Sequence, residues 1–441
     1  MLGPRGRLFT AALLAVIASL YSVAGTALAD LSLCAFRSGP KGPCTCKAPG
    51  DTPGQFTVAK RSFCLRASKA PKREADAEEL ADKATAPQKD IPPPSARPSG
   101  TEAAQQLTIS PEAGKGIVTG ANPSTLPSRL DAVRARGALA CGVNERLLGF
   151  SYQSNTGDWA GIDADFCRAI AAAVLGDPAK VEFIALDTSS RFEALKSGKI
   201  DVLSRNTTWN MSRDVDLGLE FAGVLYFDGQ SFITSDERGF VSAQQLAGAR
   251  VCVQSATTTE ANMAYYFKEH GLTAETKTFP SRDEMIKAYL AEDCDAYSAD
   301  RSSLFADRAG FDNPTRHAVL PEVISKEPLG PAVLQGDQEW TEIVRWVLAG
   351  LINAEEVGLA REAAANGKVL EGDARRLVEG AGGSGEKLRL DRQWLRNVIA
   401  AVGNYGELYD TNIGKGGALG MERGINALWK NGGILYAPPM W

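Results

Sequence analysis

The chain has 441 residues, of which 44% are hydrophobic and 23% are charged, and its formal net charge is -5 at pH 7. These proportions are typical of a soluble globular protein with two or three domains. The negative charge, together with the lack of a basic stripe, argues against nucleic acid as a partner. The only two histidines, His270 and His317, lie far apart, which argues against most histidine-based metal sites and catalytic nucleophiles.

Residues 1–29 are predicted to be a secretory signal peptide. Arg5 and Arg7 precede the apolar run Leu8–Leu20, and Ala27–Ala29 has the small residues of a cleavage site. A membrane anchor is the alternative, but the run is shorter than the roughly 20 residues of a membrane span. Bulky Leu33 argues against lipid attachment at Cys34. An exported chain is therefore expected.

The exported character of the chain makes disulfide bonds the expected state of its eight cysteines. Four of them fall in a small Gly/Pro-rich module, residues 30–67, whose core is too small to be stable alone: Cys34, Cys44, Cys46 and Cys64. Their connectivity stays open, and a zinc site is the alternative to two bridges. Residues 68–124 contain no aromatic residue and include Pro92–Pro94, which predicts a disordered linker.

From residue 125 the pattern alternates between strands and helices. The expected strands are 139–143, 181–186, 200–203, 229–234, 250–253, 276–279 and 296–298, and the expected helices are 162–174, 191–196, 243–246, 260–269 and 282–291. This alternation predicts an α/β fold of two lobes with largely parallel sheets and a cleft between them. We expect 125–227 to begin lobe 1, 228–326 to form lobe 2 and 327–352 to return to lobe 1. Residues 353–441 are expected to form a helical C-terminal extension; the tail's helices are 340–352, 392–402 and 422–429.

Several motifs follow one another in a characteristic order. They are Gly149–Tyr152, Gly161–Phe166, Leu195–Val202, Leu203–Trp209, Gln254–Glu260, Cys294–Asp300, Ile324–Pro331 and Gly403–Glu407. Together they resemble periplasmic solute-binding proteins of family 3 for polar amino acids, and within these the general L-amino-acid-binding proteins. The resemblance covers roughly residues 125–441. It implies a type II periplasmic-binding-protein fold that captures free L-amino acids and delivers them to an inner-membrane ABC permease, with no cofactor.

The resemblance also implies a ligand site made by both lobes. Arg213 matches the family arginine that holds the ligand carboxylate, for which a planar guanidinium is suited. Thr208 and Asn206 match further contacts of the first lobe. The second lobe contributes Thr257 and Thr258 at a helix start, where N–H groups attract anions.

Asp300 matches the acidic residue that binds the ligand ammonium. Each of these residues has a simpler interpretation. Arg213 lies near Asp214 and Asp216, the threonines suit a helix cap, and Asp300 suits the N-cap of 301–305, with Asp295 as the competing ammonium ligand. Arg205 is a second basic candidate, or it pairs with a surface carboxylate.

Two departures from the family pattern concern ligand preference. Leu147 stands where related specific binders have an aromatic ring, and Ala256 replaces the usual glycine before the threonines. Three aromatic residues are candidates either for the side-chain pocket or for the core: Trp209, Phe150 and Tyr226.

The remaining cysteines suggest one bridge in each lobe. Cys141 with Cys167 would join the first strand to the first helix, and Cys252 with Cys294 would cross the sheet of lobe 2. Hinge closure is the expected mechanism, with crossings near 226–227 and 326–328. The alternatives are an exported enzyme of the dehydratase kind on the same scaffold, and a sensor whose N-terminal module contacts the cell envelope.

Overall fold

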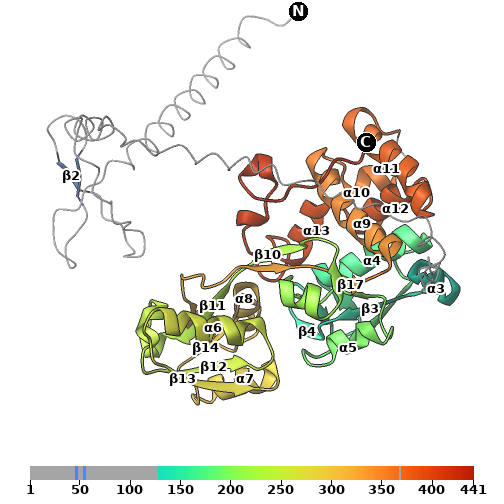
Figure 1. Cartoon of the computed structure of the whole chain (residues 1–441). Helices are drawn as coiled ribbons and strands as arrows, with labels where there is room; N and C mark the ends of the chain where they lie inside the picture. The colour runs from blue at the N-terminus through green and yellow to red at the C-terminus, as the bar shows by residue number, and fades with distance from the viewer. Residues whose placement is uncertain (1–44, 48–52, 56–127, 367–368) are drawn as a thin grey trace, which may run out of the picture. The chain divides into compact units, whose positions relative to one another are not determined.

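The computed structural model of this chain describes residues 45–47, 53–55, 128–366 and 369–441. The expected signal peptide, the linker and the pairing of the four N-terminal cysteines lie outside these residues. The chain divides into two compact units, residues 1–110 and 111–441. In the first, β1 (Thr45–Lys47) pairs antiparallel with β2 (Pro53–Gln55). All other described elements belong to the second unit (Figure 1).

Lobe 1 is built on a five-stranded sheet in the order β7-β3-β8-β17-β9. Its strands are β3 (Leu139–Val143), β7 (Val181–Ala185), β8 (Val202–Leu203), β9 (Leu219–Phe221) and β17 (Ala332–Leu334). The first three run parallel, and β17 returns from lobe 2 to pair antiparallel with β8 and β9. The accompanying elements are α3 (Arg129–Arg136), β4 (Arg146–Leu147), β5 (Ser151–Gln153), β6 (Trp159–Ala160), α4 (Ile162–Leu175) and α5 (Arg191–Lys196).

Lobe 2 is built on a second five-stranded sheet in the order β13-β12-β14-β11-β15. Its strands are β11 (Gln230–Ser235), β12 (Arg250–Gln254), β13 (Glu275–Phe279), β14 (Ala296–Asp300) and β15 (His317–Val319). Three helices follow strands: α6 (Thr258–Glu269), α7 (Arg282–Leu290) and α8 (Arg301–Ala309). Strand β12 is parallel to both of its neighbours, as expected for strands joined by helical crossovers.

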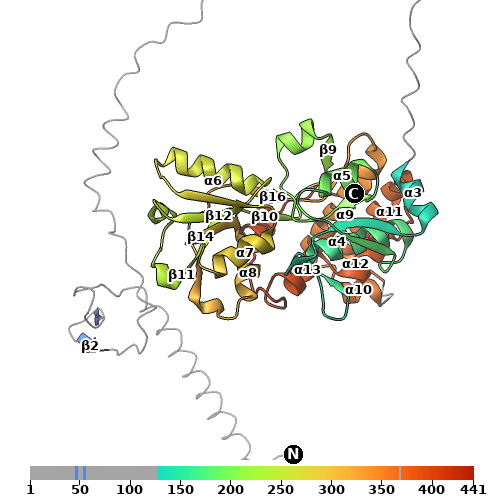
Figure 2. The ribbon, with the colours of Figure 1, turned by 90° about the horizontal axis from the view of Figure 1, so that it is seen from below.

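Two short strands connect the lobes. Strand β10 (Tyr226–Asp228) leads into lobe 2, β16 (Glu327–Leu329) leads back, and the two pair antiparallel (Figures 1 and 2). The C-terminal segment also reaches this hinge. The amide of Asn426 accepts a hydrogen bond from the Phe227 N–H at 2.7 Å and donates one to the Phe227 carbonyl at 2.9 Å.

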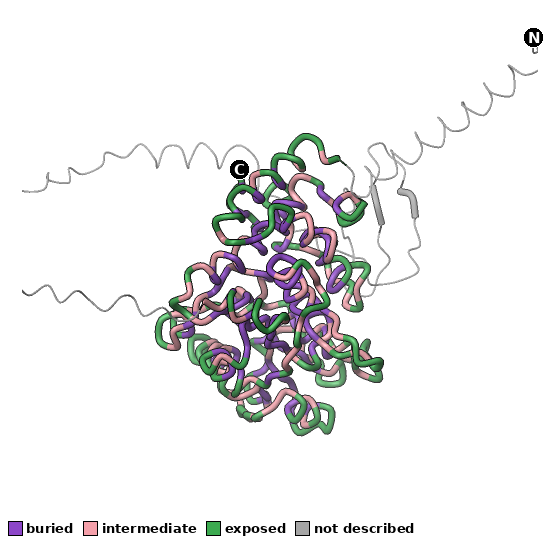
Figure 3. Tube along the Cα trace, turned by 90° about the vertical axis from the view of Figure 1, so that its right-hand side faces the viewer, coloured by how far each residue is buried: buried purple, intermediate pink, exposed green. Residues whose placement is uncertain are grey.

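The C-terminal extension is helical and shares the core of lobe 1. Helix α9 (Gln338–Glu356) leads from lobe 1 into it, and it contains α10 (Arg361–Ala365), α11 (Gly372–Gly385), α12 (Trp394–Val402) and α13 (Tyr405–Asn412). Buried Trp340, Trp394 and Tyr409 belong to one cluster with the lobe 1 residues Leu139 and Phe166. Figure 3 shows the buried segments gathered inside the fold and the exposed ones around its edge. Among the described residues, none of the helices has the length and apolarity needed to span a bilayer.

The helix expected over residues 422–429 is wrong. The segment contains only the short turn Gly424–Asn426, and a second turn follows at Trp429–Asn431. Gly424 and Gly432 have φ values of 49° and 85°, which interrupt a right-handed helix.

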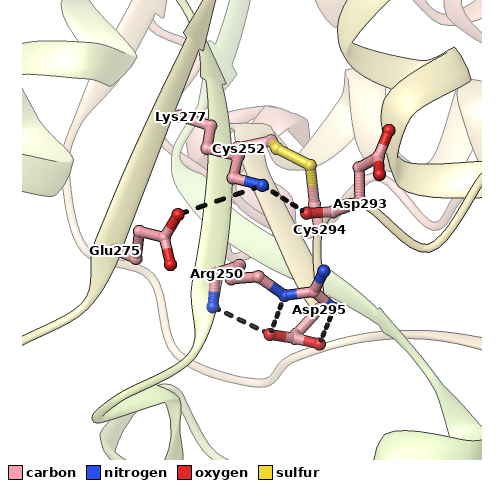
Figure 4. The surroundings of a disulfide bond; sticks show 7 residues. All are labelled: Arg250, Cys252, Glu275, Lys277, Asp293, Cys294 and Asp295. Atoms are coloured by element: carbon pink, nitrogen blue, oxygen red, sulfur yellow. Dashed lines mark hydrogen bonds and ion pairs between the residues drawn. A yellow bond between two sulfur atoms is a disulfide. The ribbon is translucent and has the colours of Figure 1, made fainter.

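Each lobe carries one of the expected disulfide bonds. Cys141 is bonded to Cys167 and Cys252 to Cys294, with Cα atoms 6.3 and 5.9 Å apart. Figure 4 shows the second bond beside Asp295, which pairs with Arg250 at 2.8 Å. Asp295 also pairs with Arg238 at 3.1 Å, so two arginines of lobe 2 already bind its carboxylate.

Candidate functional site

A cavity of about 470 Å³ lies between the two lobes. Both lobes line it, and so does every residue that the sequence predicts as a ligand contact: Asn206, Thr208, Arg213, Thr257, Thr258 and Asp300. The competing residue Asp295 is not among the lining residues. The structure thus brings the predicted cation and the predicted acid, 87 positions apart in sequence, to one shared space.

The lobes touch each other around this cavity. At the mouth, Arg146 of lobe 1 pairs with Asp283 of lobe 2 at 2.8 Å. Deeper, Gln254 Nε2 donates to Thr188 Oγ1 at 3.2 Å, and the hydroxyls of Thr208 and Thr258 are 3.5 Å apart. These contacts define a closed form of the two-lobed unit.

Arg213 lies in the short π-helical turn Ser212–Asp216, and its side chain is buried. One terminal nitrogen donates to the Thr208 carbonyl at 2.7 Å. The neighbouring Asp214 accepts instead from the indole of Trp209, so it does not pair with Arg213. Burial lowers the pKa of the Arg213 guanidinium, against the opposing effect of Glu327 and Asp300. Arg213 is therefore a buried cation facing the cavity without a carboxylate partner in the described structure.

The loop that carries Asn206 and Thr208 is fixed by Asp163 at the start of α4. The Asp163 carboxylate accepts from Ser204 Oγ at 3.1 Å and from the Asn206 N–H at 2.9 Å. Burial raises the pKa of Asp163 to about 6 although these two hydrogen bonds oppose the change. The Gly161-Ile162-Asp163 motif therefore has a structural role. It fixes the loop whose residues Asn206 and Thr208 line the cavity.

On the opposite wall, α6 begins at the threonine turn. Thr257 is its N-cap: the hydroxyl accepts from the Glu260 N–H at 3.2 Å and donates to the Gln254 carbonyl at 2.6 Å. The capping role expected for this residue is confirmed. The first N–H groups of the helix, at Thr258 and Thr259, have no intrahelical acceptor and face a site suited to an anion. Ala256 has a φ of 59°, a conformation that costs roughly 1–2 kcal/mol without glycine.

Asp300 ends β14 and stands at the N-cap position of α8, yet its side chain makes no capping hydrogen bond. Its Oδ1 atom is buried and has no hydrogen-bond partner among the described residues. Burial raises the pKa of Asp300 well above its usual range, and the charges of Asp228 and Glu327 add to this effect. A cation from a ligand would relieve both the missing hydrogen bond and the desolvation of this carboxylate.

Two further residues of this region were not identified from the sequence. Arg191, in the first turn of α5, is buried and lines the cavity. Glu327, in the hinge strand β16, is buried and accepts hydrogen bonds from Thr208 at 2.6 Å and from Thr258 at 3.2 Å. The signal for Arg191 was available, because an arginine directly after a strand and a polar turn lies at the sheet edge that faces the cleft.

Arg205 is not a surface residue, contrary to one of its two interpretations. It is buried, lines the cavity and donates through Nε to the Leu186 carbonyl at 2.7 Å. The aromatic candidates do not line the cavity. Phe150 and Tyr226 pack edge to face in the core with centroids 5.2 Å apart, and Trp209 stacks on Phe221. Leu147 does line it.

Comparison with known proteins places these features in a family. Residues 139–361 match the model of the bacterial extracellular solute-binding proteins, family 3. The chain is 45% identical to the general L-amino acid-binding periplasmic protein AapJ of Rhizobium johnstonii, over 75% of this chain and 98% of that protein. It is also 45% identical to the glutamate/glutamine/aspartate/asparagine-binding protein BztA of Rhodobacter capsulatus, over 71% and 93%.

A solved structure agrees with this assignment. The periplasmic binding protein of an ABC transporter from Brucella ovis, with glutathione bound, superposes with a TM-score of 0.69 at 45% identity, covering 71% of this chain and 99% of that one. The two lobes, the paired hinge strands and the enclosed cavity are those of the type II periplasmic-binding-protein fold. The chain therefore belongs to the bacterial extracellular solute-binding proteins of family 3.

Proposed function

We propose that this protein binds free L-amino acids in the periplasm and delivers them to an inner-membrane ABC permease. The observation that carries the proposal is that buried Arg213 and buried Asp300 line the same cavity between the lobes. A zwitterion presents a carboxylate and an ammonium, and these two buried groups are the complementary charges. The names of the amino-acid-binding relatives support the same ligand class.

In this proposal the ligand carboxylate binds the free face of Arg213 and the N–H groups that open α6, while the Thr208 hydroxyl, which donates to Glu327, lines the cavity beside them. The ammonium binds Asp300. Closure about β10 and β16 then removes the ligand from water, so that the closed form differs from the open one in a way the permease recognises.

The alternatives receive less support. An enzyme on this scaffold needs a positioned acid or base, and neither His270 nor His317 lines the cavity. The relatives that match the chain are transport binding proteins. A partner for the N-terminal module stays a separate proposal, which deletion of residues 30–124 tests: the deleted protein is expected to keep its ligand affinity.

Isothermal titration of the purified chain against the twenty L-amino acids and glutathione tests the function. Glutathione belongs in the panel because the related Brucella protein holds it. Binding of amino acids with one site per chain is expected. Binding of none of these compounds would reject the proposal.

A further inference from the structure

We propose that Arg191 and Arg205 form a second carboxylate subsite in the cavity, which makes amino acids with an acidic side chain the preferred ligands. This inference rests on the proposed function, since it assigns further residues of the same cavity. It concerns the ligand side chain, whereas Arg213 and Asp300 concern the groups that all amino acids share.

Three buried arginines of lobe 1 line the cavity: Arg191, Arg205 and Arg213, which are 4%, 6% and 8% exposed. The ion pairs in the described parts of the chain include none of the three, whereas Arg282 of lobe 2, which also lines the cavity, pairs with Asp307. The Nε atom of Arg191 is buried without any hydrogen-bond partner there. A guanidinium removed from water without a counter-charge is costly, so this arrangement is incomplete without an anion.

The acids nearby already have other partners. Asp187 accepts from the hydroxyl and the N–H of Ser190, at 2.7 Å each. Asp163 is held by Ser204 and Asn206. Glu327 accepts from threonine hydroxyls and from Asn262 Nδ2 at 2.7 Å. Asp300 alone among these acids has a buried oxygen without a partner. The cavity therefore has more unpaired cations than unpaired acids.

The charges of possible ligands decide which of them fits. A neutral amino acid brings one carboxylate for Arg213 and one ammonium for Asp300, and leaves Arg191 and Arg205 without an ion-pair partner. Glutamate or aspartate brings one more carboxylate. Guanidinium and carboxylate form parallel, charge-assisted hydrogen bonds, which are strongest where water is excluded.

The two subsites lie close together. The guanidinium carbons of Arg191 and Arg213 are 4.7 and 5.4 Å from the centroid of the same ring, that of Phe192. Arg205 uses its Nε for the Leu186 carbonyl, which leaves its two terminal nitrogens for a ligand. The pKa of Arg191 is lowered by burial and next by the positive charges of Arg205 and Arg213. An anion among these three cations removes that repulsion.

The competing explanation is that Arg191 is a structural residue held by its contact with Phe192. Titration of the full-length chain with L-glutamate and L-glutamine separates the two explanations, because these ligands differ in the side-chain charge and little in shape. We expect wild-type protein to bind glutamate at least about 10-fold more tightly than glutamine. Titration with aspartate and asparagine repeats the comparison with ligands whose side chains are one methylene group shorter.

The variant Arg191→Gln should weaken glutamate binding at least about 10-fold and change glutamine binding less than about 3-fold. Arg191→Lys should restore part of the preference. The matched control is Arg168→Gln, which removes another lobe 1 arginine held over a ring, 5.2 Å from the Phe183 centroid and away from the cavity. If Arg191→Gln fails to fold, Arg205→Gln is the second variant, with the same expected loss of discrimination.

Equal affinities of the wild-type chain for glutamate and glutamine would overturn the subsite and leave the proposed function intact. An equal loss of affinity for glutamate and glutamine in Arg191→Gln and Arg205→Gln would overturn the subsite as well, because a purely structural role predicts that result. Absence of any amino-acid binding by the wild-type chain would instead overturn the function itself.

Discussion

The two lobes face one cavity with opposite chemistry. Lobe 1 presents buried arginines, whereas lobe 2 presents the unpartnered carboxylate of Asp300 and the threonine turn of α6. Because the cations stand on one wall, that wall attracts the carboxylate end of a ligand before the lobes meet. The comparison indicates an order of events in which lobe 1 receives the ligand and lobe 2 closes on its ammonium.

The lobes also differ in how they are stabilised. Lobe 1 has a large core that it shares with the C-terminal extension, and a smaller cluster around Leu195 and Phe221. Lobe 2 has two small clusters, one around Phe232 and Val251 and the other around Met285 and Tyr297. Lobe 2 therefore depends more on its disulfide bond and on the closed cavity for its local stability.

Removing the main cation of lobe 1 should have the largest effect on binding. Arg213→Gln is expected to weaken amino-acid binding at least about 100-fold, because the ligand carboxylate is then buried without its charge partner. Calorimetric titration measures the change. Asp214→Asn is the control, since Asp214 contacts Trp209 and not the cavity. Retained affinity in Arg213→Gln would show that the carboxylate binds elsewhere.

Loss of the lobe 2 disulfide should have the next largest effect. The double variant Cys252→Ala/Cys294→Ala removes the bond between two residues that are 42 positions apart. It is expected to lower the free energy of unfolding by about 2–4 kcal/mol. Limited proteolysis should then cut within residues 228–326 first. The matched variant Cys141→Ala/Cys167→Ala removes a bond between two residues that are 26 positions apart and that belong to the larger core. Earlier cleavage of lobe 1 in that variant would contradict the proposed difference between the lobes.

The acid of lobe 2 should make binding depend on pH. The ligand ammonium needs ionised Asp300, and in the free protein the pKa of Asp300 is raised, so binding expels a proton at pH values below that pKa. Affinity should therefore rise with pH by up to about 10-fold per unit, and level off above the pKa. Titrations in buffers of different ionisation enthalpy detect the released proton. Asp300→Asn should bind weakly and lose this slope; an unchanged slope would assign the proton to another group.

The contact of the C-terminal segment with the hinge should have a smaller effect. Asn426→Ala leaves the N–H and carbonyl of Phe227 without their partners and is expected to cost about 1–2 kcal/mol of stability. Chemical denaturation measures this loss. Asn431→Ala is the control, because Asn431 is exposed and only its backbone is bonded. Equal stabilities of the two variants would show that the hinge does not need Asn426.

The smallest effect is expected at the mouth of the cavity. The side chains of Arg146 and Asp283 are 65% and 48% exposed, so their ion pair contributes only about 0–1 kcal/mol to the closed form. Asp283→Asn should raise the ligand dissociation rate less than about 5-fold at low salt and not at all at high salt. Stopped-flow measurements at two ionic strengths test this. A large effect that persists in high salt would mean that Asp283 contacts the ligand.

Much of the fold follows from local sequence signals. The strand Leu139–Val143 and the helix Arg191–Lys196 have the bounds expected from their apolar runs. Helix α6 begins at Thr258, two residues before the expected start, because Thr257 caps it. The expected helix 422–429 is wrong because periodicity ignored the glycines, whose positive φ values set the chain direction there.

The site was only partly predictable from sequence. The motifs identified Arg213 and Asp300, which come to line one cavity only because two strands cross the hinge. They did not identify Arg191, although its position after a strand and a polar turn was a usable signal. They did not identify Glu327 either, because its partners Thr208 and Thr258 are 119 and 69 positions away. Burial and pairing of charges are properties of the tertiary structure, and no local pattern encodes them.

Glu327 has a consequence for how cargo leaves this protein. Its carboxylate sits in the hinge itself and is held from three directions, by Thr208 of lobe 1, by Thr258 and Asn262 of lobe 2, and by Ser325 beside it. When the lobes separate, water replaces the lobe 2 donors at the Glu327 carboxylate, whose burial in the closed form costs free energy. Opening thus regains hydration as it loses contacts, which lowers the free-energy cost of opening the lobes for release.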